Sequence, residues 1–294
     1  MSKITQALEK AARERLQRTQ EQVTVPTSTP IAVPLVTSRL GQIAQAGEVR
    51  IDPHIVSAAD SQSPIAEQYR ILRTNLQSLR LKQGPKVIVV TSAVNGEGKS
   101  VTSINLALTF ARQENLKVLL IDADMRKSTV HKWLGLGGAP ETGLSSLLEH
   151  GGDPSGSLMT LKEPPLTVLP AGKHPDHPAE LLESMNMKKL LSTLKTQFDL
   201  IIIDAPPVLP VSDPGILAAQ ADGVLLVVRA GKTQRKTALE AQELLKKMRA
   251  TLLGCVLTHV EYYLPGYSRY YHYYREHAKD GNGTASGASS AGQS

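Results

Sequence analysis

The sequence predicts an α/β fold in which a mostly parallel sheet is covered by helices on both faces. From residue 86 to residue 260, short aliphatic segments alternate with amphipathic helical patterns. The aliphatic segments are continuously apolar, which is typical of parallel strands buried on both faces. A glycine-rich turn follows the first segment, and aspartates follow two others. We expect strands at residues 87–90, 118–121, 166–169, 200–203, 224–228 and 253–257, and helices at residues 101–112, 144–150, 178–194, 214–219 and 237–249.

Composition excludes several classes of protein. The chain has 294 residues, of which 41% are hydrophobic and 20% charged, so it is neither collagen-like nor wholly disordered. Its single cysteine, Cys255, excludes a disulfide framework. No apolar run approaches the roughly 18 residues of a membrane helix, and residues 1–20 lack the apolar segment of a secretory signal. We therefore expect a cytoplasmic protein, and its net charge of +6 does not require a nucleic-acid partner.

Four regions are expected along the chain. Residues 1–20 read as an amphipathic helix with a thin apolar stripe, either solvated or in contact with a partner or membrane surface. Residues 21–63 contain several prolines and read as a linker, in which Pro34 allows residues 31–36 to form an edge strand at most. Residues 64–260 form the main domain, beginning with a helix whose apolar stripe runs from Ile65 to Leu79. Residues 261–294 form a tyrosine-rich tail with a flexible end.

The strongest local signal is the segment from Ala93 to Ser100, which matches the Walker A pattern between a strand and a helix. Gly96 and Gly98 allow backbone N–H groups to surround phosphate oxygens. The pattern predicts a P-loop NTPase, and Val101 disfavours a dinucleotide site because a small residue is expected there. Lys99 is expected to reach the β- and γ-phosphates of ATP, and Ser100 to bind Mg²⁺. The nucleotide-binding candidates in this segment are Asn95, Gly96, Glu97, Gly98, Lys99, Ser100 and Val101.

Acidic residues follow two of the predicted strands. Asp122 and Asp124 precede Arg126 after one strand, and Asp204 follows another. Ligands of open α/β sheets bind beyond the carboxyl ends of the strands, so these groups should converge near the phosphates. Carboxylates repel a polyanion unless a cation intervenes, which favours Mg²⁺ between them. A helix cap is the alternative role for each aspartate.

Together these motifs resemble the bacterial protein-tyrosine kinases (BY-kinases) of capsule and exopolysaccharide synthesis, in their stand-alone cytoplasmic form. The segment from Asp122 to Arg126 is similar to the Walker A′ motif of that family, and the segment from Asp204 to Pro207 to its Walker B motif. Glu67, Arg70 and Arg73 match the E-x-x-R-x-x-R motif of its subunit contact. The sequence departs from the family at His177 and at Thr258, where an asparagine usually helps to hold adenine. The tail resembles the family's autophosphorylated cluster, with Tyr262, Tyr263, Tyr267, Tyr270, Tyr271, Tyr273 and Tyr274.

The resemblance implies an ATP-dependent autokinase that phosphorylates its own tail in trans and thereby regulates polysaccharide polymerisation and export. It implies that Lys99 steadies the phosphates, that Asp122 activates the tyrosine hydroxyl, and that Arg126 orients the substrate or Asp124. Ser100, Asp122 and Asp204 are the implied Mg²⁺ ligands, Asp124 supports them, and Thr258 lies at the base. The implied partners are a transmembrane co-polymerase that activates the kinase at the inner face of the membrane, further copies in an octameric ring, and a tyrosine phosphatase.

Two other functions share these motifs. A spatial-organisation ATPase has the same fold, but it carries a signature lysine where this chain has Val94. A regulatory scaffold could bind ATP without transferring phosphate, although Lys99, Ser100, Asp122 and Asp204 are all present. The tyrosines of the tail could instead pack together or stack on nucleic-acid bases. Incubation with labelled ATP separates the three functions, because only a kinase labels its own tyrosines.

Overall fold

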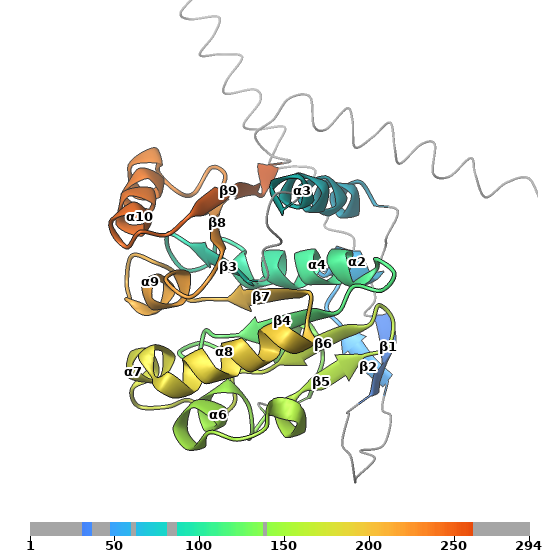
Figure 1. Ribbon diagram of the computed structural model, residues 1–294. Helices are drawn as coiled ribbons and strands as arrows, with labels where there is room; N and C mark the ends of the chain where they lie inside the picture. The colour runs from blue at the N-terminus through green and yellow to red at the C-terminus, as the bar shows by residue number, and fades with distance from the viewer. Residues whose placement is uncertain (1–30, 37–47, 60–62, 81–86, 138–139, 261–294) are drawn as a thin grey trace, which may run out of the picture.

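A nine-stranded sheet forms the centre of the molecule (Figure 1). The computed structural model describes residues 31–36, 48–59, 63–80, 87–137 and 140–260. The strand order is β2-β1-β5-β6-β4-β7-β3-β8-β9, and the last six strands in that order are parallel. These six strands confirm the predicted ones; they are β3 (Val87–Ser92), β4 (Val118–Asp122), β6 (Leu166–Leu169), β7 (Leu200–Asp204), β8 (Gly223–Arg229) and β9 (Leu252–Thr258).

The order of the parallel strands brings the candidate residues to one edge. The P-loop follows β3, and the chain crosses over to β4 while leaving room for β7 between them. β7 is therefore hydrogen-bonded to both strands, with Asp204 in register with Val90 on one side and Asp122 on the other. The carboxyl ends of these three strands deliver the P-loop and both aspartates to the same place.

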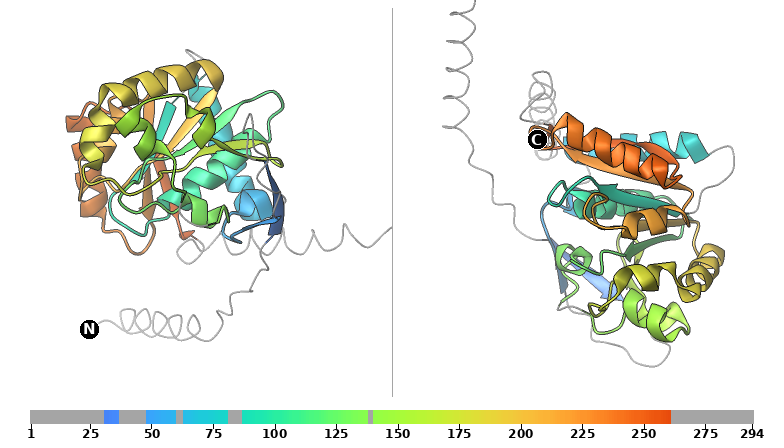
Figure 2. Two further views of the ribbon diagram at one scale, coloured as in Figure 1. Left: turned by 90° about the horizontal axis from the view of Figure 1, so that it is seen from below. Right: turned by 90° about the vertical axis from the view of Figure 1, so that its left-hand side faces the viewer.

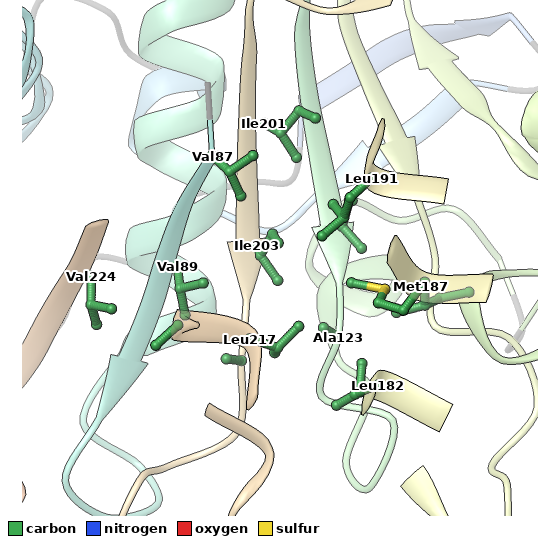
Figure 3. Close-up of a cluster of buried hydrophobic side chains, with 14 of the residues drawn as sticks. Val87, Val89, Ala123, Leu182, Met187, Leu191, Ile201, Ile203, Leu217 and Val224 are labelled. Atoms are coloured by element: carbon green, nitrogen blue, oxygen red, sulfur yellow. The ribbon is translucent and has the colours of Figure 1, made fainter. Parts of the chain in front are cut away.

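Helices cover the sheet in two layers, as predicted, and each layer has its own apolar core. Side chains from β3, β7 and β8 meet Leu182, Met187, Leu191 and Leu217 in one core (Figure 3). Figure 2 shows the sheet between the two layers. One layer contains α2 (Val56–Ala59), α3 (Pro64–Arg80), α4 (Lys99–Ala111) and α5 (Val130–Trp133), and the other contains α6 (Leu144–His150), α7 (Pro178–Glu183), α8 (Met185–Gln197), α9 (Asp213–Ala218) and α10 (Arg235–Lys247).

The helix predicted at residues 178–194 is two helices. α7 ends at Glu183, and Ser184 adopts an extended conformation (ψ 160°) before α8 begins. The Ser184 hydroxyl accepts a hydrogen bond from the Met187 N–H, at 3.3 Å, and so caps α8. The apolar pattern runs through both helices because both pack on the same face of the sheet, which is why periodicity alone suggested one element.

The linker predicted at residues 21–63 is partly wrong, because residues 48–59 belong to the fold. Ile51 and Ile55 are buried (1% and 0% exposed) in the core next to α4. Residues 31–36 form a strand that is not at the edge, but Pro34 lies within residues 31–34, which pair on one side only. A proline there breaks no second ladder. The antiparallel strands that extend the sheet are β1 (Ile31–Val36), β2 (Glu48–Ile51) and β5 (Met159–Leu161).

The apolar stripe of α3 is buried only in its middle. Leu76 is 3% exposed and packs on α4, whereas Ile65 and Leu79, near the ends of the helix, are 39% and 57% exposed. The prediction of one continuous buried face is therefore wrong at both ends. Within the described part of the chain, no helix has the length and apolar character needed to cross a membrane.

Candidate active site

The P-loop between β3 and α4 has the backbone shape of an anion cradle. Gly96 and Gly98 adopt left-handed conformations, with φ of 79° and 92°. A Cβ atom at Gly96 would face open space, whereas one at Gly98 would lie 3.4 Å from Thr258. The positive φ angles are the reason that glycine is required at both positions. The resulting turn directs successive N–H groups toward one point, ahead of the N-terminus of α4. This observation fits the predicted phosphate site.

Lys99 joins the P-loop to the strand-end aspartates. Its Nζ atom lies 2.6 Å from Asp124 Oδ2, 3.7 Å from Asp204 Oδ2 and 3.3 Å from the Ser100 hydroxyl. All three aspartates are at most 2% exposed, and Lys99 is 9% exposed. The structure therefore brings together the lysine, the serine and the three aspartates that the sequence singled out.

The cluster around Lys99 is too negative for a buried site. Burial raises the pKa of Asp122 well above its usual range, and the neighbouring Asp204 carboxylate raises it further. Burial also raises the pKa of Asp204, although the Lys99 ammonium opposes that shift. Burial lowers the pKa of Lys99, but the carboxylates of Asp204 and Asp124 outweigh burial and leave this pKa raised. One ammonium does not balance three buried carboxylates, so the site favours a further cation.

The residues present fit Mg²⁺ bound together with ATP. Among the described residues, Asp204 Oδ2 is buried without a hydrogen-bond partner, while Asp204 Oδ1 accepts a bond from Ser103 Oγ at 3.1 Å. An orphaned carboxylate oxygen near the Ser100 hydroxyl suits a hard cation or its water. In the same part of the chain, no three acidic, histidine or cysteine side chains are arranged to hold a metal by themselves. Phosphate oxygens of the nucleotide would therefore supply the remaining ligands.

Asp122 is held by the loop that follows it. Its Oδ1 atom accepts a hydrogen bond from the Asp124 N–H and its Oδ2 atom one from the Val130 N–H, each at 3.2 Å. Val130 is the first residue of α5, and the preceding Thr129 donates a hydrogen bond to Ser100 Oγ at 3.3 Å. The orientation of the Asp122 carboxylate thus depends on the position of α5.

Arg126 does not contact Asp124 through a hydrogen bond, contrary to one of its expected roles. Its guanidinium makes two bonds to the Asp213 carboxylate, at 2.8 and 3.0 Å. Asp213 is fully buried at the start of α9, and the sequence analysis missed it. Its hydrogen bonds to Asp213 are the first cause of the raised pKa of Arg126. The Ser-Asp-Pro sequence gives only a helix-start signal, so no local pattern shows that Asp213 pairs with Arg126.

The side chains of Thr258 and Glu97 stabilise the conformation of the P-loop. Thr258 Oγ1 donates to the Glu97 carbonyl at 2.8 Å, and the buried Glu97 side chain accepts bonds from the Val94 N–H (2.8 Å) and the Thr233 hydroxyl. Arg229, which the sequence analysis also missed, donates to the Gly96 carbonyl at 3.3 Å. Through its bonds to Val94 and Thr233, the Glu97 side chain stabilises the conformation of the P-loop. Asn95 is exposed on the loop, and Val101 lies half-buried in α4.

The predicted interface residues lie on α3. Arg70 pairs with Glu67 at 2.5 Å on the partly exposed surface of the helix. Arg73 donates to the Thr109 carbonyl of α4 at 3.0 Å, so one of its N–H groups braces α3 against its own domain, and its part in a subunit contact stays a prediction. All seven predicted phosphoacceptor tyrosines lie outside the described residues, as does the predicted helix at residues 1–20.

Comparisons with known proteins cover most of this domain. Residues 85–252 match the family model described as AAA domain. The chain is 40% identical over 208 residues to the tyrosine-protein kinase YwqD of Bacillus subtilis (strain 168), which covers 71% of this chain and 86% of that protein. The range that the family model matches includes the P-loop and the strand-end aspartates.

Solved structures with the same fold include two at TM-scores above 0.6. The chimerical protein CapA2B2 has a TM-score of 0.66 and 32% identity, covering 71% of this chain and 91% of its own. The kinase domain of the Escherichia coli tyrosine kinase ETK has a TM-score of 0.65 and 28% identity, covering 69% of this chain and 79% of its own.

Proposed function

The chain belongs to the bacterial tyrosine-protein kinases, and on this premise we propose that it transfers the γ-phosphate of ATP to tyrosines in the C-terminal tails of neighbouring copies. The observation that carries the proposal is the position of Lys99, which lies between the glycine cradle and the carboxylates of Asp124 and Asp204. A buried ammonium at this place is within a short distance of the cradle that would hold the phosphates, and the neighbouring carboxylates would hold Mg²⁺, which would supply further positive charge.

Each side chain of the cluster has a distinct role in this proposal. Lys99 neutralises charge on the transferred phosphoryl group, and the cation would be held by the Ser100 hydroxyl and by Asp204 Oδ2, which has no hydrogen-bond partner among the described residues. When bound, Mg²⁺ supplies the positive charge that three buried carboxylates and a triphosphate require. Asp124 keeps the ammonium in place before the nucleotide binds. Transfer then depends mainly on positioning and electrostatics.

Asp122 is the proposed base for the tyrosine hydroxyl. Burial and the Asp204 carboxylate raise its pKa, which makes its ionised form a stronger proton acceptor than an ordinary aspartate. Both of its oxygens are held by backbone N–H groups, so the carboxylate is fixed before substrate arrives. Proton acceptance at a fixed atom suits a hydroxyl that approaches from a second copy.

The tail is the proposed substrate because it is rich in tyrosine and interleaved with charged residues. An extended chain rises by ~3.3 Å per residue, so Tyr274 can lie about 45 Å from residue 260. That reach is sufficient for a neighbouring site. Each phosphotyrosine adds about −1.5 to −2 charge. Unmodified tails would therefore dock near the acidic, Mg²⁺-dependent site, and modified tails would be expelled by like charge.

We propose that α3 supplies a subunit contact of an octameric ring through Glu67 and Arg70. Their ion pair is partly exposed and available to a second copy, whereas Arg73 supports the helix through the Thr109 carbonyl. Changing Arg70 to Ala should give smaller particles in light scattering and slower autophosphorylation. An unchanged ring in the Arg70→Ala variant would refute the contact.

The remaining partners of the kinase follow from its family. We propose that a transmembrane co-polymerase activates it at the inner face of the membrane, that a tyrosine phosphatase reverses its action, and that this cycle controls polysaccharide export. Residues 1–30 are the proposed contact with the co-polymerase. Co-purification after deleting residues 1–30 tests this, because that deletion leaves the folded residues 48–59 in place.

Phosphosite mass spectrometry after incubation with ATP and Mg²⁺ tests the proposed activity. Wild type should carry phosphate on tyrosines between 262 and 274, and the Lys99→Met variant should carry none. Lys189→Met is a matched control, since this exposed lysine lies on α8 in the opposite layer. Phosphate release without tyrosine labelling would identify a spatial-organisation ATPase, and ATP binding without either would identify a scaffold.

A further inference from the structure

Residues 50–58, here called the strap, are fastened to the helix that begins at the P-loop. The buried side chain of Asn105 in α4 accepts a hydrogen bond from the Ser57 N–H at 2.8 Å and donates to the His54 carbonyl at 3.1 Å. Arg112 donates twice to the Ser57 carbonyl, at 2.7 and 3.1 Å. The Ser57 and Thr109 hydroxyls lie 2.9 Å apart. Side chains from the C-terminal half of α4, together with that of Arg112 just after it, thus hold the strap.

The same strap contacts α5. The Asp52 N–H donates to the Trp133 carbonyl at 2.9 Å, and the His54 ring meets the Trp133 ring edge to face, with centroids 5.8 Å apart. Gly135, directly after α5, lies so close to the strap that a Cβ atom there would be 2.2 Å from the Arg50 carbonyl oxygen. Because the atoms on both sides of this contact belong to the backbone, no flexible side chain can move aside to relieve a clash.

The other end of α5 holds the active site. The Val130 N–H, at the start of this four-residue helix, bonds to Asp122 Oδ2, and the preceding Thr129 hydroxyl bonds to Ser100 Oγ. Val130 and Leu134 are fully buried in the same apolar core as Ile51 and Ile55 of the strap. A shift of the strap would therefore move α5 as a unit, because a single helical turn cannot absorb it internally.

We propose that the strap is a positioning element of the catalytic site, which sets the Asp122 carboxylate by clamping α5 against α4. The inference rests on the proposed function, since Asp122 is there the base that receives the tyrosine proton. It adds residues before the P-loop strand to the machinery, with Asn105, Trp133 and Gly135 as positioning residues. Because the strap reaches the site through Asp122 and the Ser100 hydroxyl, we expect it to affect the rate of phosphate transfer more than the affinity for ATP.

Gly135→Ala separates this contact from other effects. Both Gly135 and Gly137 have positive φ (64° and 86°), but a Cβ atom at Gly137 would have nothing within 4 Å. Gly137→Ala is therefore a matched control with the same backbone strain and no clash with the strap. We expect Gly135→Ala to slow autophosphorylation at saturating ATP and Mg²⁺ about ten- to a hundredfold, with a much smaller change in the affinity for ATP. Gly137→Ala should change neither quantity.

Hydrogen exchange distinguishes a strap that positions α5 from one that only covers α4 and α5. Gly135→Ala should increase amide exchange in the strap and in residues 123–130, and the same pair of changes should appear in Asn105→Ala, which loosens the strap from α4. Asn186→Ala is the control, because Asn186 makes a similar amide bond to the Leu148 carbonyl in the other layer. If Gly135→Ala fails to fold, Asn105→Ala carries the test.

Two results would overturn the inference. One is faster exchange in the strap with unchanged exchange in residues 123–130 and an unchanged autophosphorylation rate. The other is an equal loss of ATP binding and of rate, which would place the strap in general support of the P-loop. Failure of the proposed function is separate, because wild type itself would then label no tyrosine.

Discussion

Two charge clusters with buried carboxylates lie near the same edge of the sheet, and they differ in their balance. Around Lys99 three buried carboxylates share one ammonium, and one carboxylate oxygen has no hydrogen-bond partner in the described structure. Arg126 and Asp213 form a one-to-one pair with two hydrogen bonds. Such an imbalance is costly in a buried cluster, and it is consistent with the proposed site for a cation and phosphates. The balanced pair fixes the loop between β4 and α5.

The largest effect on the rate should come from a substitution in the cluster around Lys99, here called the overcharged cluster because three carboxylates share one ammonium. Asp122→Asn removes the proposed base and is expected to reduce the rate of autophosphorylation by about 10²–10⁴. Rates at saturating ATP measure this, with tyrosine labelling as the readout. Asp176→Asn, at an exposed position, is the control. A rate within a few-fold of wild type would show that Asp122 accepts no proton.

Matched substitutions in the two clusters should have different effects on stability. Asp213→Asn breaks the balanced pair and should lower the free energy of unfolding by about 1 kcal/mol, because Arg126 is partly exposed and its charge is screened by solvent. Asp204→Asn, at an equally buried position, removes a carboxylate whose pKa burial raises, and should leave the ligand-free protein as stable or more stable. Urea titrations compare them. Equal losses of stability would remove the distinction between the clusters.

The pH dependence of stability should reveal the same imbalance. Because the pKa values of Asp122 and Asp204 are raised in the folded state, the folded protein holds protons that the unfolded chain has released. The contribution of these groups to stability therefore decreases as pH rises from the unfolded pKa through the raised folded values. Thermal melts of wild type and Asp204→Asn from pH 4 to pH 8 measure the difference. A mutant curve parallel to wild type would contradict it.

The smallest effect is expected at the rim of the P-loop. Thr258→Val keeps the shape of the side chain but loses the hydrogen bond to the Glu97 carbonyl. A hydrogen bond of this kind contributes about 1 kcal/mol, so affinity for ATP should fall a few-fold. Titration with a fluorescent ATP analogue measures it. Unchanged affinity would mean that Thr258 only fills space beside Gly98.

The same comparison explains how much the sequence could predict. Lys99, Asp122 and Asp204 follow strands with strong patterns, and parallel strands bring such ends together, so the overcharged cluster was predictable. Asp213 pairs with Arg126, a residue 87 positions away, and no periodicity connects the two. The strap was read as part of a linker because Pro53 interrupts it and its short apolar segments carry no helical or strand period. Its burial depends on contacts with Asn105 and Trp133 that only the folded chain provides.

Mixing two variants tests the central claim most directly. One carries Lys99→Met with an intact tail, and the other keeps Lys99 but has phenylalanine in place of tyrosines 262–274. After incubation with ATP and Mg²⁺, mass spectrometry should find phosphate on the tail of the Lys99→Met copies only in the mixture. A Lys99→Met tail that stays unmodified beside the active copy would contradict transfer between neighbouring chains.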